Sequence, residues 1–514
     1  MLRNGAGQSL IMPIMFHSLV GGRLLILGIC SALAVLLGYL IATPLAFQTL
    51  AIVAVVCGII CLPLLIRWHH FFLILSWNAT FTLFFLPGQP SLSMVMTLIS
   101  FGFALLDYCV NKKKHFISVP AITWPLVFLA LVILATAKLT GGIGLHSLGS
   151  GVYGGRKYYF LLIAILGYFA LTSQAIPVER ALKTASAYFL SGTTGVVSNI
   201  AYLLGPGFYF LFYLFPTGST VSAMHTGLDY LIRFSGVSWA SIAVYYYMLM
   251  RYGIRGVMDF TAPGRFVVFL AIIGASTLGG FRSVLLVMAT VFLVQFYFEG
   301  LFRSAYAPVI ILAGVLLGAL LVPFADKLPL AVQRSLSFLP IEVDPIARQN
   351  AQATLDWRLA MWRILLKEVP KYLVVGKGYA INPTDLYLTE EGVRRGFYDT
   401  TEQSMISSDY HNGPLTVLIP FGIAGAGGFL WLCLAGLRVV SRNYRYGDPA
   451  LRNINTFLMT LYCVRIVVFL TLYGDFSTDL ATFSGTLGLS IALNGGVRGR
   501  EQTKTNPNAP DQVV

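Results

Sequence analysis

The chain has 514 residues, of which 57% are hydrophobic and only 11% are charged. Soluble proteins carry about 25% charged residues, so this composition excludes an ordinary soluble domain and indicates a protein that crosses a membrane several times. In a membrane protein, a net charge of +14 indicates an excess of Lys and Arg in the cytoplasmic loops. The sequence has no stripe of Lys and Arg between aromatic residues, so we expect no nucleic-acid partner.

Long apolar runs dominate the chain. A spanning helix needs about 20 apolar residues, and these runs predict an all-α, polytopic membrane protein with roughly 12–14 transmembrane helices. A turn is expected at residues 279–282, because one continuous helix there would invert every later basic loop. The expected spans lie near residues 22–42, 46–66, 70–88, 92–109, 119–138, 157–174, 184–205, 235–252, 265–280, 283–299, 305–324, 414–438, 455–473 and 480–494.

The distribution of polar residues divides the chain into four parts. We expect a bundle of about 11 spans at residues 1–324, one large loop with short amphipathic helices at 325–413, further transmembrane helices at 414–496 and a disordered tail at 497–514. The stretch 325–417 holds eleven of the 21 acidic residues of the chain. Charge in a hydrophobic protein gathers where water and polar substrates are, so we expect the chemistry there.

Basic residues set the expected orientation, because Lys and Arg of short loops collect on the cytoplasmic side. With the spans given above, the strongly basic loops all fall on one side of the membrane. We therefore expect both termini to be cytoplasmic and the 325–413 loop to lie outside. The basic groups are Arg67, Lys112 to Lys114, Arg180 with Lys183, Arg251 with Arg255, Arg303, Arg438 with Arg442, Arg445 and Arg452, and Arg498 with Arg500.

Two arginines stand out on the outer side. Arg282 lies between two full apolar spans, where it either presents its charge to an anionic headgroup or snorkels at a helix end. Arg358 and Trp362 are four residues apart on one face of an expected amphipathic helix at 356–366. The alternative for this pair is an interfacial anchor.

One histidine lies where the polar loop re-enters the membrane. His411 can accept a proton near neutral pH, as a general base does. Its neighbour Asn412 precedes the Gly413-Pro414 helix start, and the alternative is that these polar residues only cap the helix. Three more arginines are candidates: Arg233 and Arg156 at outer helix ends, and Arg465 in the middle of a span, where it needs a partner or water.

Two patterns are missing from the sequence. No Asp or Glu lies deep in an expected span, although ion-coupled transporters usually need one. The outer loops also lack the paired aspartates that hold a metal on a diphosphate. We therefore expect no metal and no cofactor, because arginine grips phosphate without one.

Several motifs together resemble the superfamily of bacterial O-antigen ligases and polymerases. The resemblance covers roughly residues 220–430 and rests on the order and spacing of the motifs. They are the serine-then-arginine helix end at 276–285, Arg358-x-x-x-Trp362 with Pro370 and Gly376-Lys377-Gly378-Tyr379, Asp409-Tyr410-His411-Asn412 with Leu415, Gly422 and Gly425, and the weaker Arg233-x-x-Gly236. The ligases often carry a Glu in the helix after His-Asn, whereas this chain has Leu418-Ile419-Pro420-Phe421, and Pro420 predicts a kink.

The resemblance implies a GT-C-like membrane glycosyltransferase of the bacterial inner membrane with a periplasmic active site. The implied donor is a glycan on undecaprenyl diphosphate, and the implied acceptor is another lipid-linked glycan or lipid A-core. The product would be an exopolysaccharide, O-antigen polymer or lipopolysaccharide, and a chain-length regulator and a flippase are implied partners. His411 would be the base. Arg282, Arg358 and Arg233 would hold the diphosphate, with Asn412, Trp362, Arg465 and Arg156 in support. The alternative is a transporter (flippase) of polysaccharide or lipid-linked oligosaccharide.

Overall fold

The computed structural model describes residues 47–111, 116–144, 153–216, 233–395 and 400–499, together with most of 27–38. Residues 500–514 of the tail expected at 497–514 and the Lys112–Lys114 group lie outside these residues. The chain divides into two compact units, Met1–Arg67 and Trp68–Val514. In the first unit the described residues are helical and include the first part of α2 (Phe47–Ser76).

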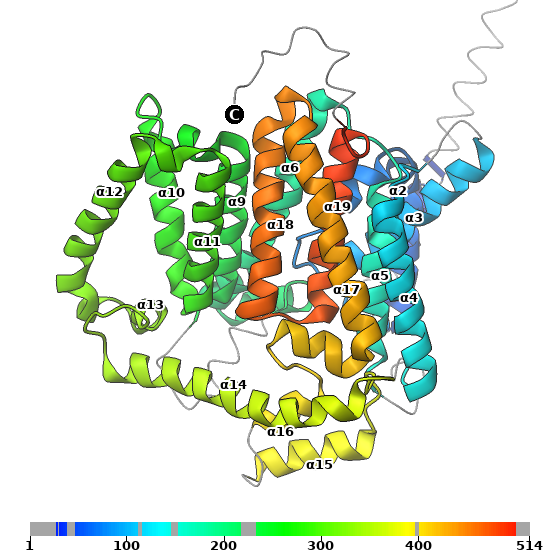
Figure 1. The fold of residues 1–514 in the computed structure, drawn as a ribbon. Coiled ribbons are helices and arrows are strands. Elements are labelled where there is room, and N and C mark those ends of the chain that lie inside the picture. Colours follow the sequence, from blue (N-terminus) through cyan, green and yellow to red (C-terminus); the bar gives the residue numbers. More distant parts are fainter. Residues whose placement is uncertain are drawn as a thin grey trace, which may run out of the picture. The chain divides into compact units, whose positions relative to one another are not determined.

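The second unit is built from helices, and across its described residues the extended structure is limited to two isolated β-bridges. This confirms the expected all-α class (Figure 1). Its α-helices are α3 (Leu92–Val110), α4 (Pro120–Thr140), α5 (Gly155–Leu171), α6 (Val178–Leu190), α7 (Val196–Leu204), α9 (Ser235–Val257), α10 (Pro263–Ser276), α11 (Arg282–Phe298), α12 (Tyr306–Leu321), α13 (Leu330–Leu336), α14 (Pro345–Tyr372), α15 (Pro383–Arg394), α16 (Thr400–Ile406), α17 (Gly413–Tyr446), α18 (Arg452–Thr471) and α19 (Phe476–Asn494).

Many of these helices are apolar enough for a membrane. By length and composition, the described segments Gly58–Ser76, Leu92–Val110, Pro120–Thr140, Gly413–Tyr446 and Pro449–Thr471 suffice to span one. Shorter apolar helices cover Pro263–Gly279, Arg282–Phe298 and Tyr306–Ala319. The chain is therefore a multi-pass membrane protein, while the total of 12–14 spans stays a prediction.

The separate spans expected at 46–66 and 70–88 are wrong. One helix, α2, runs through both Arg67 and the polar residues that follow it. The helix continues past Arg67 because the two histidines that follow are buried and hydrogen-bonded: His69 Nδ1 is 2.8 Å from Ser100 Oγ, and His70 Nε2 is 2.8 Å from the Leu171 carbonyl oxygen. The turn comes later, in the segment 77–91, which is rich in Pro and Gly.

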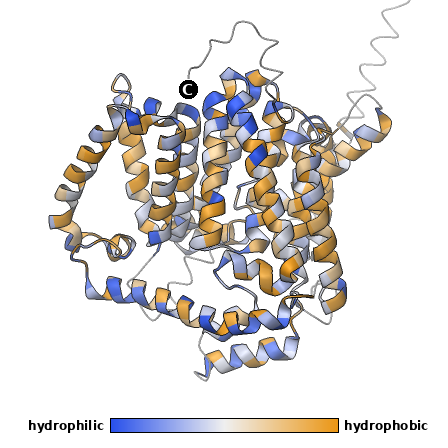
Figure 2. Ribbon diagram, viewed as in Figure 1, coloured by the Kyte–Doolittle hydropathy of each residue, from blue (hydrophilic) through white to orange (hydrophobic). Residues whose placement is uncertain are grey.

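The polar part of the chain lies at one end of the bundle. Helices α14, α15 and α16 lie at the end opposite the connection between α17 and α18 (Figure 1), and Figure 2 shows α14 and α15 as largely hydrophilic. We call this the loop end. The amphipathic helix expected at 356–366 exists within α14, which is much longer, at 28 residues. The buried core beneath it is formed by α4, α5, α17, α18 and α19.

A break in α17 joins the bundle to the polar layer. The helix contains Pro420, and Gly422 has a left-handed φ of +63°, so the expected kink is confirmed. The freed backbone pairs with the segment after α14: the amide of Lys377 donates to the Ile419 carbonyl at 2.8 Å, and that of Gly378 donates to the Pro420 carbonyl at 3.0 Å. The G-x-G turn thus fixes the end of α14 against α17.

This junction yields a stability prediction. Replacing Gly422 by Ala places a Cβ 2.5 Å from the Leu373 carbonyl oxygen at a positive φ, a conformation that costs about 1–3 kcal/mol for a residue with a side chain. Gly427→Ala is the matched control, because it lies in the same helix with no atom within 4 Å of its added Cβ. In a thermal-unfolding measurement in detergent, we expect G422A to melt several degrees lower and G427A to match wild type. Equal melting temperatures would contradict the junction's role.

Candidate active site

The turn between α10 and α11 presents the first arginine. After a short 3-10 turn (Thr277–Gly279), Gly280 takes a left-handed φ of +68°, and α11 begins at Arg282. The turn predicted here is therefore confirmed, and it lies on the described loop-end side of the bundle. Ser335 Oγ donates to the Thr277 carbonyl at 3.0 Å, so α13 packs beneath the turn and holds its shape.

Arg233 lies against the same turn. Its Nε donates to the Gly279 carbonyl at 3.0 Å, and its guanidinium lies 4.0 Å from the centre of the Phe281 ring. A cation over an aromatic face is stabilised by the ring quadrupole. The weak Arg-x-x-Gly pattern therefore marks an arginine that contacts the residues directly before Arg282 in the chain.

A fourth arginine, which sequence reasoning missed, connects this turn to α14. Arg334 of α13 is buried and donates to the Gly280 carbonyl, to Asn350 Oδ1 at 2.6 Å and to Thr354 Oγ1 at 3.1 Å. Arg334 is one of ten basic residues in the polar stretch, and its seven-residue helix carries no motif that distinguishes it. Only the tertiary packing reveals its role.

The four arginines lie within electrostatic range of one another. Burial and the charges of Arg233, Arg282 and Arg358 lower the pKa of Arg334 to about 9, and burial lowers the pKa of Arg233 to about 10. Burial and Arg282 likewise lower the pKa of Arg358. A guanidinium keeps its proton in proteins, so burial and mutual repulsion of the four charges raise the free energy of the cluster. A bound anion would lower that free energy.

Two buried donors near this cluster have no protein partner among the described residues. They are Nε of Arg358 and the indole Nε1 of Trp357, which adjoin each other in α14. A buried donor without a partner costs about 1–3 kcal/mol, so these two groups require a partner from outside the chain, either water or a ligand. The Trp357 ring lies edge-on to the His411 ring at 5.5 Å, so these donors adjoin the histidine.

His411 is held in a strained backbone conformation. Its φ is +48°, which is rare for a residue with a side chain and is typical of functional sites. Its Nδ1 lies 3.6 Å from Asp409 Oδ1. Burial lowers the pKa of His411, Arg358 and Lys157 lower it further, and Asp409 and Asp475 oppose the shift. The imidazole is therefore largely neutral at neutral pH, as a proton acceptor must be.

The predicted helpers of His411 hold its loop in place. Trp362 Nε1 donates to the Tyr410 carbonyl at 2.8 Å, and Asn412 Oδ1 accepts from the Leu415 amide at 3.1 Å and caps α17. Lys157, a second residue that sequence reasoning missed, donates to the Ser408 carbonyl at 3.0 Å. These three contacts fix the backbone on both sides of the histidine.

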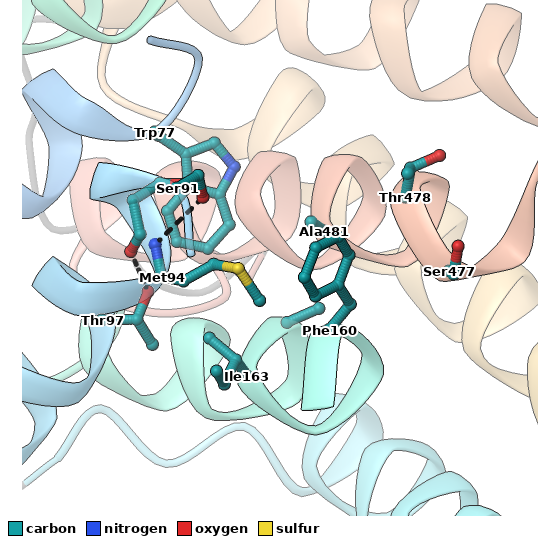
Figure 3. A pocket seen from close by; sticks show the side chains of 11 residues that line it. Trp77, Ser91, Met94, Thr97, Phe160, Ile163, Ser477, Thr478 and Ala481 are labelled. Atoms are coloured by element: carbon teal, nitrogen blue, oxygen red, sulfur yellow. Dashed lines mark hydrogen bonds between the residues drawn. The ribbon is translucent and has the colours of Figure 1, made fainter. Parts of the chain in front are cut away.

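Two predicted site residues lie elsewhere. Arg156 donates to the Gln89 carbonyl at 3.2 Å and lies over the ring of Phe160. That ring lines a cavity of about 180 Å³ between α3, α5 and α19, shown in Figure 3 with Met94 and Trp77 on its far side. Arg465, in α18, lines a different cavity. Neither is among the charges that shift the pKa of Arg334.

The chemistry of the site follows from its residue types. The described residues contain no group of three or more His, Cys, Asp or Glu side chains that could hold a metal ion. What the site does offer is a set of converging guanidiniums for phosphate oxygens and a neutral imidazole beside them. This combination suits the transfer of a group from a phosphate leaving group to a hydroxyl.

Comparison with known families agrees with this geometry. Residues 264–430 match the model of a family described as O-antigen ligase, a range that includes Arg282, Arg334, Arg358 and His411. This match supports the expected O-antigen ligase superfamily over that part of the chain, and the family suggests a membrane enzyme that transfers a glycan. No curated protein matches the chain.

The arginine cluster predicts an anion effect that needs no substrate. Inorganic pyrophosphate at tenfold over its dissociation constant stabilises a protein by about 1.4 kcal/mol, so we expect it to raise the melting temperature of the wild-type protein. Arg282→Lys keeps the charge but loses the fork that grips phosphate, and we expect it to weaken pyrophosphate binding about tenfold, so that the same concentration stabilises this variant by only about 0.4 kcal/mol. Arg156→Lys, outside the cluster, is the control. Equal responses of both variants would rule out the cluster as the anion site.

Proposed function

We propose that this chain, whose residues 264–430 match the O-antigen ligase family, is an inverting, metal-independent glycosyltransferase of the bacterial inner membrane. It moves a glycan from undecaprenyl diphosphate to a sugar hydroxyl on the periplasmic side, as an exopolysaccharide or O-antigen polymerase or as an O-antigen ligase. The observation that carries the proposal is the pair of unpartnered buried donors, Arg358 Nε and Trp357 Nε1, between the arginine cluster and His411.

The arginines stabilise the diphosphate leaving group. When the bond between the anomeric carbon and the phosphate oxygen breaks, the electron pair stays with the diphosphate, whose charge rises. Arg282 and Arg358, helped by Arg233, are placed to take up that charge, because preorganised donors stabilise developing charge without further reorganisation. Arg334 has most of its donors engaged by Gly280, Asn350 and Thr354, so we assign it to positioning.

The acceptor is activated by His411. A hydroxyl of the acceptor sugar attacks the anomeric carbon from the face opposite the phosphate, which inverts the configuration, and its proton passes to the imidazole and then to water. A positioned base contributes about 10²–10⁴-fold to such a step. Asp409, 3.6 Å from Nδ1, stabilises the imidazolium that forms. We place the polymerase reaction first, with a second lipid-linked glycan as acceptor, and the ligase reaction with lipid A-core next.

The direct test uses purified full-length protein, a lipid-diphosphate-linked oligosaccharide and EDTA. We expect a ladder of lengthened glycans from wild type and at least about a 100-fold loss in His411→Ala. His70→Ala, a buried histidine bonded to the Leu171 carbonyl, is the control for general effects of losing an imidazole. Product only with added lipid A-core would assign the ligase reaction. Lipid that crosses the bilayer without transfer would establish the flippase instead.

The pH dependence tests the role of His411. Because burial lowers its pKa from 6.5, the base stays neutral until the pH falls below that value, and we expect kcat/KM to decline on the acid side with a midpoint under 6.5. Asp409→Asn removes a charge that raises this pKa, so the midpoint should move to still lower pH. Asp385→Asn, on the exposed face of α15, should leave it in place. A midpoint that rises in D409N would overturn the assignment.

A further inference from the structure

A second cavity lies beside the bundle core, and none of the four clustered arginines lines it. Its volume is about 210 Å³, and it lies among α6, α9, α18 and α19. The cavity of Figure 3 lies against a different face of α19, which contributes Ala481 to that cavity and Thr482 to this one. The side chains that matter for its chemistry are Tyr188, Trp239, Tyr246, Arg465, Thr482 and Thr486.

Arg465 is the cavity's unexplained group. Its Nε is buried and has no hydrogen-bond partner among the described residues. A charged side chain within a membrane helix is costly and marks a substrate path or another functional site. Asp479, Tyr246 and Tyr188 interact with it electrostatically, yet none of them forms an ion pair with it within 4 Å among the described residues. The guanidinium therefore has donors left for a ligand.

The cavity is close to the proposed reaction site. Arg465 lies six residues before the end of α18 and Thr482 six residues after the start of α19, so both are about 9 Å from the loop end. Tyr473, in the connection between these helices, interacts electrostatically with both Arg465 and Arg358. A ligand group in the cavity is thus within reach of a glycan that is held at the arginine cluster.

The lining identifies the class of ligand. Aromatic faces, hydroxyl groups and one arginine are the groups that bind a sugar, whose ring has apolar faces and a hydroxyl edge. A diphosphate fits poorly, because one guanidinium with Asp479 nearby offers little net positive charge. The volume is below the roughly 300–1,000 Å³ of pockets for larger ligands, which restricts the occupant to a single ring.

We propose that this cavity binds one pyranose residue of a glycan substrate, with Arg465 donating to its oxygens and the aromatic side chains against its ring. The inference deepens the proposed function and rests on it for the identity of the glycan. The ring belongs either to the donor chain or to the acceptor, and the kinetic experiment separates these two sources. Such a site would select the substrate by a sugar that does not itself react.

The test compares neighbouring tyrosines of α9. Tyr246 lines the cavity, so Tyr246→Phe removes the hydroxyl of a lining residue. Tyr247 does not line it, and Tyr247→Phe removes a hydroxyl that accepts a hydrogen bond from Arg251. We expect Tyr246→Phe and Arg465→Lys to raise one KM about threefold to tenfold with kcat within twofold, as loss of uniform binding does. A raised donor KM places the donor's ring in the cavity, and a raised acceptor KM places the acceptor's. Unchanged KM values for both substrates in a folded Tyr246→Phe would overturn the proposal.

A binding measurement keeps this test independent of turnover. Trp239 lines the cavity, so we expect the lipid-free repeat-unit oligosaccharide to change tryptophan fluorescence in wild type but not in Trp239→Phe. If wild type transfers no glycan yet this signal appears, the proposed reaction is wrong and the sugar site stands. If transfer occurs but the same signal persists in Trp239→Phe, the sugar site is wrong and the reaction stands.

Discussion

The hydrogen bonds of Arg334 are the constraint on which the site depends. Two unit charges about 8 Å apart repel by roughly 2 kcal/mol at an effective dielectric constant of about 20, so a cluster of four arginines does not assemble by itself. Arg334 bridges the Gly280 turn to Asn350 and Thr354 of α14. It thereby holds the elements that carry Arg282 and Arg358 together, and the stored repulsion becomes affinity for an anion.

The same logic applies to the histidine side of the site. The kink of α17 exposes backbone groups, and the turn after α14 satisfies them through the Ile419 and Pro420 carbonyls. Trp362, on α14, donates to the backbone next to His411. Because α14 is linked to the arginine turn through Arg334 and contacts the histidine loop directly, one helix sets the distance between the leaving group and the base, as positioning for catalysis requires.

The sequence predicted those parts of the site that local patterns encode. The turn at Arg282 followed from the balance of basic loops, the amphipathic face of α14 from apolar spacing, and His411 from its place where polar sequence re-enters an apolar run. Arg334 had no such pattern, because its partners are 16 to 54 residues away in the chain. The prediction of two separate spans in place of α2 failed for a related reason. His69 and His70 form hydrogen bonds with residues of helices distant in the chain, so these polar side chains need no contact with water.

The central claim is that a diphosphate is held by the arginine cluster with the reacting sugar facing His411. The measurement that tests it most directly is a cryo-EM structure of the full chain in nanodiscs with a non-hydrolysable analogue of the lipid-diphosphate donor. Our account predicts density for the diphosphate bonded to Arg282 and Arg358, with Arg358 Nε now paired and the anomeric carbon on the side of the imidazole. A diphosphate bound elsewhere, with the arginines unchanged, would contradict it.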